Sequence, residues 1–536
     1  MEAQQKQAGI RAAVVEPLER RQLMAAGVTG TYYNNMNFTG TSASRVDAAV
    51  NFNFSKTPLP KGITTSTYSV RWLATITPTT SETYTFSARS DEGIRVWVNH
   101  KLIIDNYKPH AVNEVAGSIA LVSGQPYDIQ IEYYNNMGPA VAQLSWSTPT
   151  IAKSVIPASV FSTRKLNLKD QIDHEFTFAE SQFTKAIAQI GSTSKDAYDN
   201  TTSAGAWTTT GPDAWTAGFF PGAMWQIYAH NTRRSWRLNA TAWTRPIGPF
   251  AKNGDDIGFR IWSSYFPMAG STKLAADKAV LIQAADAKMA NWNADVGMFE
   301  TAPPATKTAT NFTVVLDQSM DMELLWWAWK ETGKTSYRDR AMSHLNKVAQ
   351  FMVRPDGSTM QVAAFNRNTG AFIGPVLKQG YSTTSTWSRG QGWAIHSFAT
   401  AYQQTKDTAF ASTAKKLANY WVANLPPDGV PYWDFNAPGI PGTYRDTSAA
   451  AVAASGLISL SQTLGGDPDA ANYKASAEQT LSGLLSSTYN AEGKASPGLL
   501  LHAAHWVSKK RSVDNTLIYA DYYFLQAMNR YLGTPQ

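Results

Sequence analysis

The chain has 536 residues and a formal net charge of +7. This length exceeds what one hydrophobic core usually organises, so two or more domains are expected. The complete absence of cysteine excludes disulfides, thiolate catalysis and cysteine-ligated metals. The basic residues are scattered and no apolar run reaches the length of a membrane span, which argues against a nucleic-acid partner and a membrane-spanning segment.

Residues 1–26 are expected to form an export-type segment. The stretch from Val15 to Ala26 reads VEPLERRQLMAA and is similar to a short N-terminal segment of many exported bacterial proteins. The first residues lack the continuous apolar core of a secretory signal, and an ordinary polar tail is the alternative. The segment predicts an extracellular or periplasmic location and leaves the export route open.

Residues 27–165 have the pattern of an all-β domain. Short alternating runs at 84–88, 95–98 and 127–133 are separated by clusters of Gly, Pro, Asn and Ser. Alternation of this kind is typical of half-buried strands, and its spacing predicts a sandwich or a barrel.

Residues 166–536 change to apolar positions at intervals of three and four, which predicts an all-α domain. The clearest expected helices span 275–292, 336–352, 392–404 and 448–463. Paired helices joined by aromatic and Gly-rich loops would form a closed ring of helical hairpins.

Four stretches of the helical half concentrate polar and aromatic residues. They are 215–225, 254–260, 314–328 and 379–394. The third is expected to be an apolar helix with Asp317 and Asp321 one turn apart on the same face, where like charges need compensation.

Each of these residues also has a purely structural interpretation. Asp256 and Asp317 could cap helices, and Arg389 could form a structural ion pair. The stretch around Arg389 combines Gln, Arg and Trp, as a site for a sugar or a carboxylate would.

The β half resembles the protective-antigen-type domain. The likeness lies in GTYYN from Gly30, SARSDEGIRVWVN from Ser87, LIIDN from Leu102, IEYY from Ile131 and LSW from Leu144. The resemblance implies a β-barrel-like sandwich that usually binds carbohydrate, in some relatives through calcium.

Calcium needs several oxygen ligands on one surface. Asp91, Glu92 and Asp105 are the candidate ligands, and they could equally be turn residues. The β-domain is therefore expected to bind polysaccharide, with calcium as a possible cofactor.

The helical half resembles the unsaturated glucuronyl hydrolases, glycoside hydrolase family 88, through nearly all of residues 170–533. Besides the four stretches, the likeness includes RPDGST from Arg354, LPPDGVPYWDF from Leu425, DTSAAA from Asp446 and DYYFLQA from Asp521. The resemblance implies a six-hairpin (α/α)6 barrel with the active site at one end, and an enzyme that removes a 4,5-unsaturated uronic acid from the non-reducing end of lyase-generated oligosaccharides.

The resemblance assigns residues to roles as follows. The catalytic aspartate falls on Asp317 and its partner carboxylate on Asp256, while substrate-binding positions fall on Trp215, Gln379, Arg389 and Trp393. Two positions depart from the family, which commonly has His where this chain has Gln361 and Lys378. Both are kept as substrate-binding candidates, and Lys378 could pair with a uronate carboxylate or a sulfate. A position near His505 is a further candidate for substrate contact.

The family reaction is hydration of a vinyl ether. An acid protonates C4, positive charge develops at C5 and the ring oxygen, water adds at C5, and the hemiketal opens to release the aglycone. Asp317 would hold the proton near neutral pH only if its pKa rose from about 3.9 to about 6 or 7. An apolar surround and an anionic Asp256 would both act in that direction. The scheme needs no metal or other cofactor.

Two rival functions remain open at this point. One is the related unsaturated rhamnogalacturonyl hydrolase, which shares the barrel and the hydration chemistry. The other is a non-catalytic polysaccharide-binding or adhesive protein. The source polymer, the preference for sulfation and the oligomeric state are not predicted by the sequence.

Overall fold

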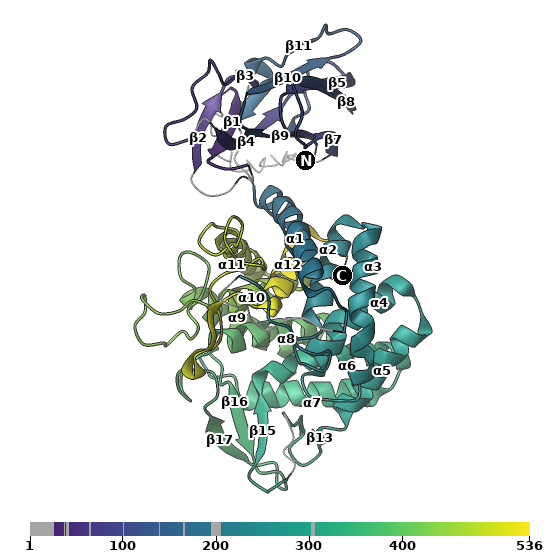
Figure 1. Ribbon diagram of the computed structural model, residues 1–536. Helices are drawn as coiled ribbons and strands as arrows, with labels where there is room; N and C mark the ends of the chain where they lie inside the picture. Colours follow the sequence, from purple (N-terminus) through teal and green to yellow (C-terminus); the bar gives the residue numbers. More distant parts are fainter. Residues whose placement is uncertain are drawn as a thin grey trace, which may run out of the picture. The chain divides into compact units, whose positions relative to one another are not determined.

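The computed structural model describes residues 26–535, apart from 37, 39–41, 64–65, 100, 139, 164–166, 195–204 and 302–305. The chain divides into two compact units, Met1–Leu166 and Asn167–Gln536 (Figure 1). This division lies one residue from the boundary expected from the sequence. The expected export segment lies outside the described residues except for Ala26.

The first unit is built from two antiparallel sheets. One has the strand order β2-β1-β4-β9-β6-β7 with β12 paired to β4, and the other has the order β11-β10-β5-β8 with β3 paired to β10. The described strands are β1 Val28–Tyr33, β2 Ser42–Asp47, β3 Asn51–Asn53, β4 Thr67–Ile76, β5 Glu82–Ser90, β6 Ile94–Val98, β7 Lys101–Asn106, β8 Asn113–Leu121, β9 Tyr127–Asn136, β10 Val141–Ser147, β11 Ser154–Val155 and β12 Phe161–Thr163.

Side chains from both sheets meet in one core, which makes the unit a β-sandwich. Trp72 and Tyr133 of the first sheet share this core with Phe86 and Trp146 of the second, and all four are buried. Along β1 and β6 buried and half-buried positions alternate, as two-residue periodicity requires of a strand with one face inward. The strands expected at 84–88, 95–98 and 127–133 lie within β5, β6 and β9, so the all-β prediction is confirmed.

The second unit is a double ring of helices. The inner helices contact one another around a closed ring, in which the turn Gly258–Trp262 provides the contact between the second and the third, and the outer helices pack against them. The inner helices are α2 Phe219–Asn231, α4 Ser263–Thr272, α6 Met322–Thr332, α8 Ser388–Thr405, α10 Thr447–Leu464 and α12 Ile518–Leu532. The outer helices are α1 Leu168–Ile190, α3 Arg234–Thr244, α5 Ala275–Met289, α7 Thr335–Phe351, α9 Thr408–Asn424 and α11 Pro468–Leu484. This arrangement confirms the (α/α)6 barrel.

The inner helices α8 and α10 show why the ring closes tightly. In α8 every residue from 388 to 401 is buried, and in α10 every residue from 447 to 460. A helix buried on all sides must be surrounded by other elements. Gly456 of α10 lies so close to α8 that a Cβ there would come within 2.8 Å of the Cα of His396. Only glycine permits this approach.

The inner helices run in parallel, because an outer helix between consecutive inner helices returns the chain to the same end. The segments before their N-termini therefore gather at one end of the barrel. Several short strands lie in these segments and in the other connections: β13 Trp292–Asn293, β14 Met298–Phe299, β15 Phe312–Val315, β16 Val362–Phe365, β17 Phe372–Val376, β18 Ala503–Trp506 and β19 Arg511–Asn515. The polar and aromatic stretches of the sequence begin in the same segments.

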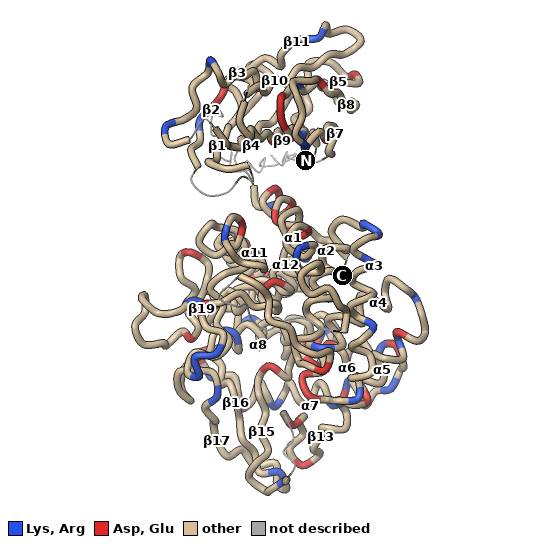
Figure 2. The backbone as a smooth tube through the Cα atoms, viewed as in Figure 1, with Lys and Arg blue, Asp and Glu red and all other residues tan. Residues whose placement is uncertain are grey.

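The surface agrees with the expectations from composition. Lys and Arg are scattered along both units and do not form a continuous stripe (Figure 2). Across the part of the chain that the structure describes, no helix combines the length and the apolar character needed to cross a membrane.

Candidate active site

The segment that carries Asp317 begins as a strand rather than as a helix. β15 ends at Val315, a 3-10 helix (η4) spans Leu316–Asp321, and α6 follows. The expectation of one helix over 314–328 is therefore wrong at its start, because the β-branched residues there pair with β16. A 3-10 helix has about three residues per turn, so residues four apart do not share a face. Asp317 and Asp321 consequently serve different purposes.

Asp321 is a buried anchor. Its Oδ2 lies 2.7 Å from Nζ of Lys288, and both side chains are almost completely excluded from solvent. Its Oδ1 accepts a hydrogen bond of 2.7 Å from the backbone N–H of Gly258. A Cβ at Gly258 would lie 2.6 Å from this oxygen, so glycine is required for the contact. Asp321 thus fixes the Asp317 segment against the Asp256 segment.

The Asp256 segment is held in an unusual backbone conformation. Asp256 has a φ of 46° and lies just before a π-helical turn (η3), Gly258–Trp262. Strained residues and π-turns both occur preferentially at functional sites. Arg260 is buried and donates hydrogen bonds to the carbonyl oxygens of Asp213 at 2.6 Å and Asn253 at 3.0 Å. These bonds fix the loop on both sides of Asp256.

The pKa of Asp256 is raised to about 7. Burial is the main cause, and the negative charges of Asp255, Asp321 and Asp317 add to it, while Lys288 acts in the opposite direction. At neutral pH this carboxyl therefore holds a proton for a substantial fraction of the time.

The pKa of Asp317 is also raised, because the carboxyl is buried. Lys378 and Arg389 act against this rise by favouring the charged form. Within the described residues, Oδ1 of Asp317 is buried and accepts no hydrogen bond. Asp317 is therefore a carboxyl that faces two cations, next to a second carboxyl that retains its proton more readily.

Arg389 has a different place from the one expected. It is buried, and its Nη1 donates to Oδ2 of Asp446 at 2.7 Å and to the carbonyl oxygen of Ala504 at 2.6 Å, while Nη2 donates to the carbonyl oxygen of His505 at 2.8 Å. Its guanidinium also lies over the ring of Trp387. The structural ion pair considered as the alternative is thus present. Direct substrate contact by Arg389 is not supported, because its terminal nitrogens are committed to the protein.

Gln361 and Gln379 are buried and are joined by hydrogen bonds of their side-chain amides. Nε2 of Gln361 donates to Oε1 of Gln379 at 2.8 Å, and Oε1 of Gln361 accepts from the backbone N–H groups of Gln379 and Gly380. Nε2 of Gln379 donates to the carbonyl oxygen of His505 at 2.9 Å. The hydrogen bonds of the two amides fix the backbone next to Lys378. Contact of Gln361 or Gln379 with substrate stays a prediction.

Trp215 and His505 lie together at this end of the barrel. The two rings are nearly parallel, with centroids 6.1 Å apart, and Trp215 is half-buried. Nδ1 of His505 lies 3.1 Å from the hydroxyl of Tyr519. Burial and the charge of Arg389 lower the pKa of His505 to about 3, so the ring is neutral. A half-buried indole beside a neutral imidazole suits stacking against a sugar ring.

Trp393 does not belong to the substrate-binding surface. Its side chain is 1% exposed. Its ring lies 5.1 Å from the rings of Phe259 and Tyr523, inside the barrel. The expectation that Trp393 contacts substrate is corrected, because the first turns of α8 are buried on every face.

Lys378 is the exposed cation of the site. Its side chain is exposed, and its charge acts on both Asp317 and His505. Within the described residues it forms no ion pair. An exposed ammonium group next to the candidate acid is placed to receive an anionic group of a ligand.

Lys288 is not among the site residues expected from the sequence, although the helical pattern around it indicates a buried lysine. On α5 it continues the buried stripe of Leu281, Ala284 and Ala285 at helical spacing. A lysine on an apolar face is rarely left without a partner. Its partner, Asp321, was noted only for its charge.

The calcium candidates do not come together as a set of ligands. Asp91 is buried and its Oδ1 accepts from the hydroxyl of Tyr133 at 2.8 Å and from the N–H of Val141 at 2.9 Å. Asp105 is exposed on β7, across the ladder from Arg95. Glu92 is half-buried, and its pKa is raised by burial and by Asp91. Among the described residues, no group of three or more His, Asp or Glu side chains is positioned to hold a metal ion.

Both units are similar to known proteins. Residues 24–159 match the family model of the PA14 domain. The unsaturated glucuronyl hydrolase of Bacillus sp. (strain GL1) is 31% identical over 325 residues, which cover 59% of this chain and 85% of the relative. The unsaturated chondroitin disaccharide hydrolase of Streptococcus agalactiae serotype III (strain NEM316) is 31% identical over 326 residues, with 59% and 81% covered.

A solved structure agrees with the relatives. The crystal structure of an unsaturated glucuronyl hydrolase specific for heparin has a TM-score of 0.64 and 29% identity to this chain, and the match covers 68% of this chain and 98% of that structure. The fold and its sequence relatives therefore lead to the same conclusion: this chain belongs to the unsaturated glucuronyl hydrolase family.

Proposed function

We propose that this chain is a glycoside hydrolase that removes the 4,5-unsaturated uronic acid from the non-reducing end of oligosaccharides produced by polysaccharide lyases. The observation that carries the proposal is the arrangement around Asp317. Two half-buried carboxyl groups with raised pKa values interact electrostatically, and one of them, Asp317, also interacts with the exposed Lys378, at the barrel end where Trp215 and His505 are stacked. Such an arrangement can bind an anionic sugar and deliver one proton to it.

Lys378 links substrate binding to the protonation of Asp317. In the free protein its charge lowers the pKa of Asp317. A uronate carboxylate bound to Lys378 would neutralise that charge and exclude water, so the pKa of Asp317 would rise. The proton shared by the pair, which Asp256 retains more readily in the free protein, would then favour Asp317. Substrate binding itself would therefore prepare the acid.

In this mechanism Asp317 donates its proton to C4 of the unsaturated ring. The two electrons of the C4–C5 double bond form the new C–H bond, and positive charge develops at C5 and the ring oxygen. Water then adds at C5 while the Asp317 carboxylate accepts its proton, and the hemiketal opens to expel the aglycone. The distance between two carboxylates that separates retaining from inverting glycosidases does not apply, because no displacement occurs at the anomeric carbon.

Replacement of the proton donor tests this assignment. Asp317→Asn keeps the shape of the side chain but cannot donate the proton, so kcat should fall at least about 10³-fold with KM changed little. The loss of ultraviolet absorbance of the conjugated double bond measures the rate. Asp339→Asn on the exposed face of α7 is the control and should behave as wild type. Retention of more than a tenth of the activity by Asp317→Asn would contradict the assignment.

The pKa of Asp256 predicts the pH dependence. The carboxyl is protonated below about pH 7 and loses its proton as the pH rises through this value. Because the pair must hold one proton, kcat/KM should decline above about pH 7. Asp255→Asn removes a charge that raises the pKa of Asp256, so this decline should begin at lower pH. A rate that stays constant from about pH 6 to 9 would rule out the shared proton.

Lys378 should determine affinity for the uronate. Lys378→Ala removes a charge-assisted contact, so KM should rise about tenfold. The same change removes a charge that lowers the pKa of Asp317, so the alkaline decline should move to higher pH. Lys378→Arg keeps the charge and is the matched control. The role would be refuted by an unchanged KM and an unchanged pH profile in Lys378→Ala.

The β-sandwich is proposed to bind polysaccharide, and the chain is proposed to be exported. The match to the PA14 domain model supports the first proposal, and residues 15–26 support the second. Affinity electrophoresis in gels that contain chondroitin, heparin, hyaluronan, ulvan, gellan, xanthan or pectin should show retardation of the full chain, and none after deletion of residues 27–165. Equal mobility in every gel would exclude the binding role.

The absorbance assay with unsaturated disaccharides of the same polymers would identify the substrate. Turnover of the pectin-derived compound alone would favour an unsaturated rhamnogalacturonyl hydrolase.

A further inference from the structure

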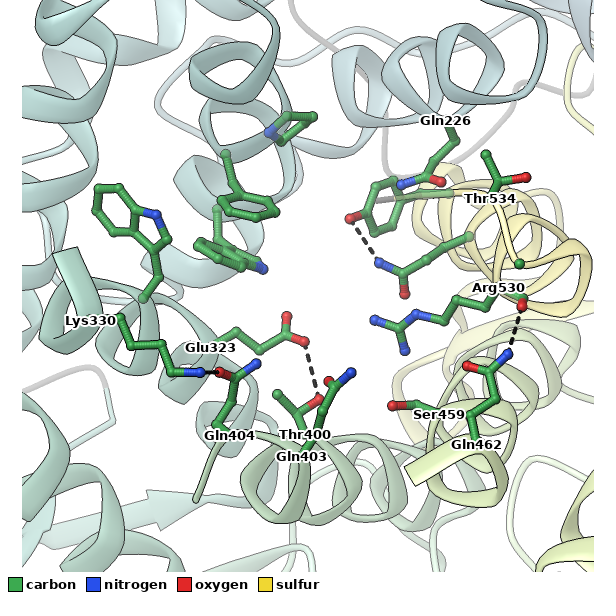
Figure 3. A pocket seen from close by; sticks show the side chains of 17 residues that line it. Gln226, Glu323, Lys330, Thr400, Gln403, Gln404, Ser459, Gln462, Arg530 and Thr534 are labelled. Carbon is green, nitrogen blue, oxygen red and sulfur yellow. Dashed lines mark hydrogen bonds between the residues drawn. The ribbon is translucent and has the colours of Figure 1, made fainter. Parts of the chain in front are cut away.

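The barrel contains a second cavity, at the end opposite Asp317. It has a volume of about 500 Å³ and is lined by residues of the inner helices, among them Gln226 of α2, Trp327 of α6, Thr400 of α8 and Arg530 of α12 (Figure 3). Thr400 follows Arg389 along α8 by about 16 Å, at a rise of ~1.5 Å per residue. The cavity is therefore distinct from the candidate active site.

A layer of buried aromatic rings lies between the two ends. Trp393 packs against Phe259 and Tyr523 with ring centroids 5.1 Å apart, and Phe219 lies 5.9 Å from Tyr523. All four side chains are at most 3% exposed. Close-packed rings of this kind leave no path for a sugar through the barrel. A ligand of the second cavity must enter from the opposite mouth.

One wall of the cavity is aromatic. Trp262 and Phe266 are stacked, with centroids 4.0 Å apart and planes 21° apart, and Trp327 lies 6.5 Å from Trp262. All three are half-buried, so part of each ring remains accessible. Flat apolar faces of this kind suit the C–H face of a pyranose ring.

The opposite wall and the floor are polar. Gln226, Thr400, Ser459 and Gln526 are all less than 9% exposed and line the cavity, while Gln462 is exposed at its rim. Amides and hydroxyls both donate and accept hydrogen bonds. Gln226, Thr400 and Gln526 also have partners within the protein, in Asn529, Glu323 and Ser455. A polar lining of this kind favours a ligand that carries hydroxyl groups over an apolar one.

Two opposite charges point toward the open middle of the cavity. Figure 3 shows the carboxylate of Glu323 and the guanidinium of Arg530 directed inward from facing sides. Glu323 accepts hydrogen bonds from Thr400 and Trp262, and Nη1 of Arg530 is held by His396 and the carbonyl oxygen of Ser455. The third charged residue of the lining, Lys330, is exposed, and its Nζ donates to Oε1 of Gln404. The two charges that point into the cavity therefore offset each other, and its interior favours neither an anion nor a cation. Both side chains can engage adjacent hydroxyl groups, as bidentate groups.

We infer that this cavity binds a neutral monosaccharide or disaccharide. Its volume lies within the range of about 300–1,000 Å³ typical of small-molecule sites. The aromatic wall, the paired amides and hydroxyls, and the balanced charges match the apolar face and the hydroxyl-rich edge of an uncharged sugar. The inference is independent of the proposed reaction, because no group of the candidate active site contributes to the cavity.

Isothermal titration calorimetry of the full chain with glucose, galactose, rhamnose, cellobiose and lactose tests this inference. At least one sugar should bind saturably. Trp327→Ala removes part of the aromatic wall and should weaken binding at least tenfold. Trp329→Ala is the control on the same helix, because its ring packs beside Arg338 rather than in the cavity, and it should change affinity less than twofold. Glu323→Gln preserves the shape of the side chain and should weaken binding about threefold or more, which covers the case in which Trp327→Ala fails to fold.

Hydrolysis of an unsaturated disaccharide, measured in parallel, separates this inference from the proposed reaction. Trp327→Ala and Glu323→Gln should leave the rate of hydrolysis within twofold of wild type while they bind the neutral sugar more weakly. Absence of saturable binding for every sugar of the panel would overturn the inference. Binding that both variants retain at wild-type strength would also overturn it, because the sugar would then occupy another part of the chain. A chain that binds the sugar at this cavity but hydrolyses no unsaturated disaccharide would refute the proposed reaction alone.

Discussion

The buried ion pair between Lys288 and Asp321 is the interaction on which the candidate active site depends. Each charge without the other would be strongly destabilised inside the barrel, so the two must stay together. Asp321 also binds the backbone of Gly258, and it thereby joins α5, the 3-10 turn and the π-helical turn. Asp317 and Asp256 each lie a few residues from one of these fixed points. Their separation is consequently set by buried contacts and not by the mobility of surface loops.

Electrostatics then distinguishes the two carboxyls. Both are half-buried, but Asp317 faces Lys378 and Arg389, whereas Asp256 faces mainly other carboxylates. Arg389 acts from within the protein, because Asp446 and backbone carbonyls hold its terminal nitrogens. Lys378 is exposed, so its ammonium group can bind an anionic group of the substrate. Once it is paired in this way, its charge lowers the pKa of Asp317 less than before. One lysine can therefore serve in both recognition and proton transfer.

The parallel inner helices give the barrel two different ends. The loops before their N-termini carry the acids, Trp215 and Lys378, and the inner helices themselves surround a cavity lined by amides, hydroxyls and aromatic rings. Trp393 lies in the aromatic layer between the two. Trp393, which the sequence predicted to contact substrate, thus lies between the candidate active site and the cavity. The same ring of helices can support an acidic site at one end and a neutral polar cavity at the other.

The sequence by itself determined the two-unit organisation and the β-sandwich followed by the (α/α)6 barrel, and it singled out Asp317 and Asp256 as candidate acids, because periodicity and local motifs depend on neighbouring residues. It did not determine which polar residues turn inward. Arg389, Gln361 and Trp393 share the composition expected of a sugar site, yet buried partners occupy the first two and the third is enclosed by rings. Only the tertiary structure could pair Lys288 with Asp321, or bring Glu323 of α6 and Arg530 of α12 into one cavity. Burial and charge pairing depend on segments far apart in the chain, and local spacing carries no information about them.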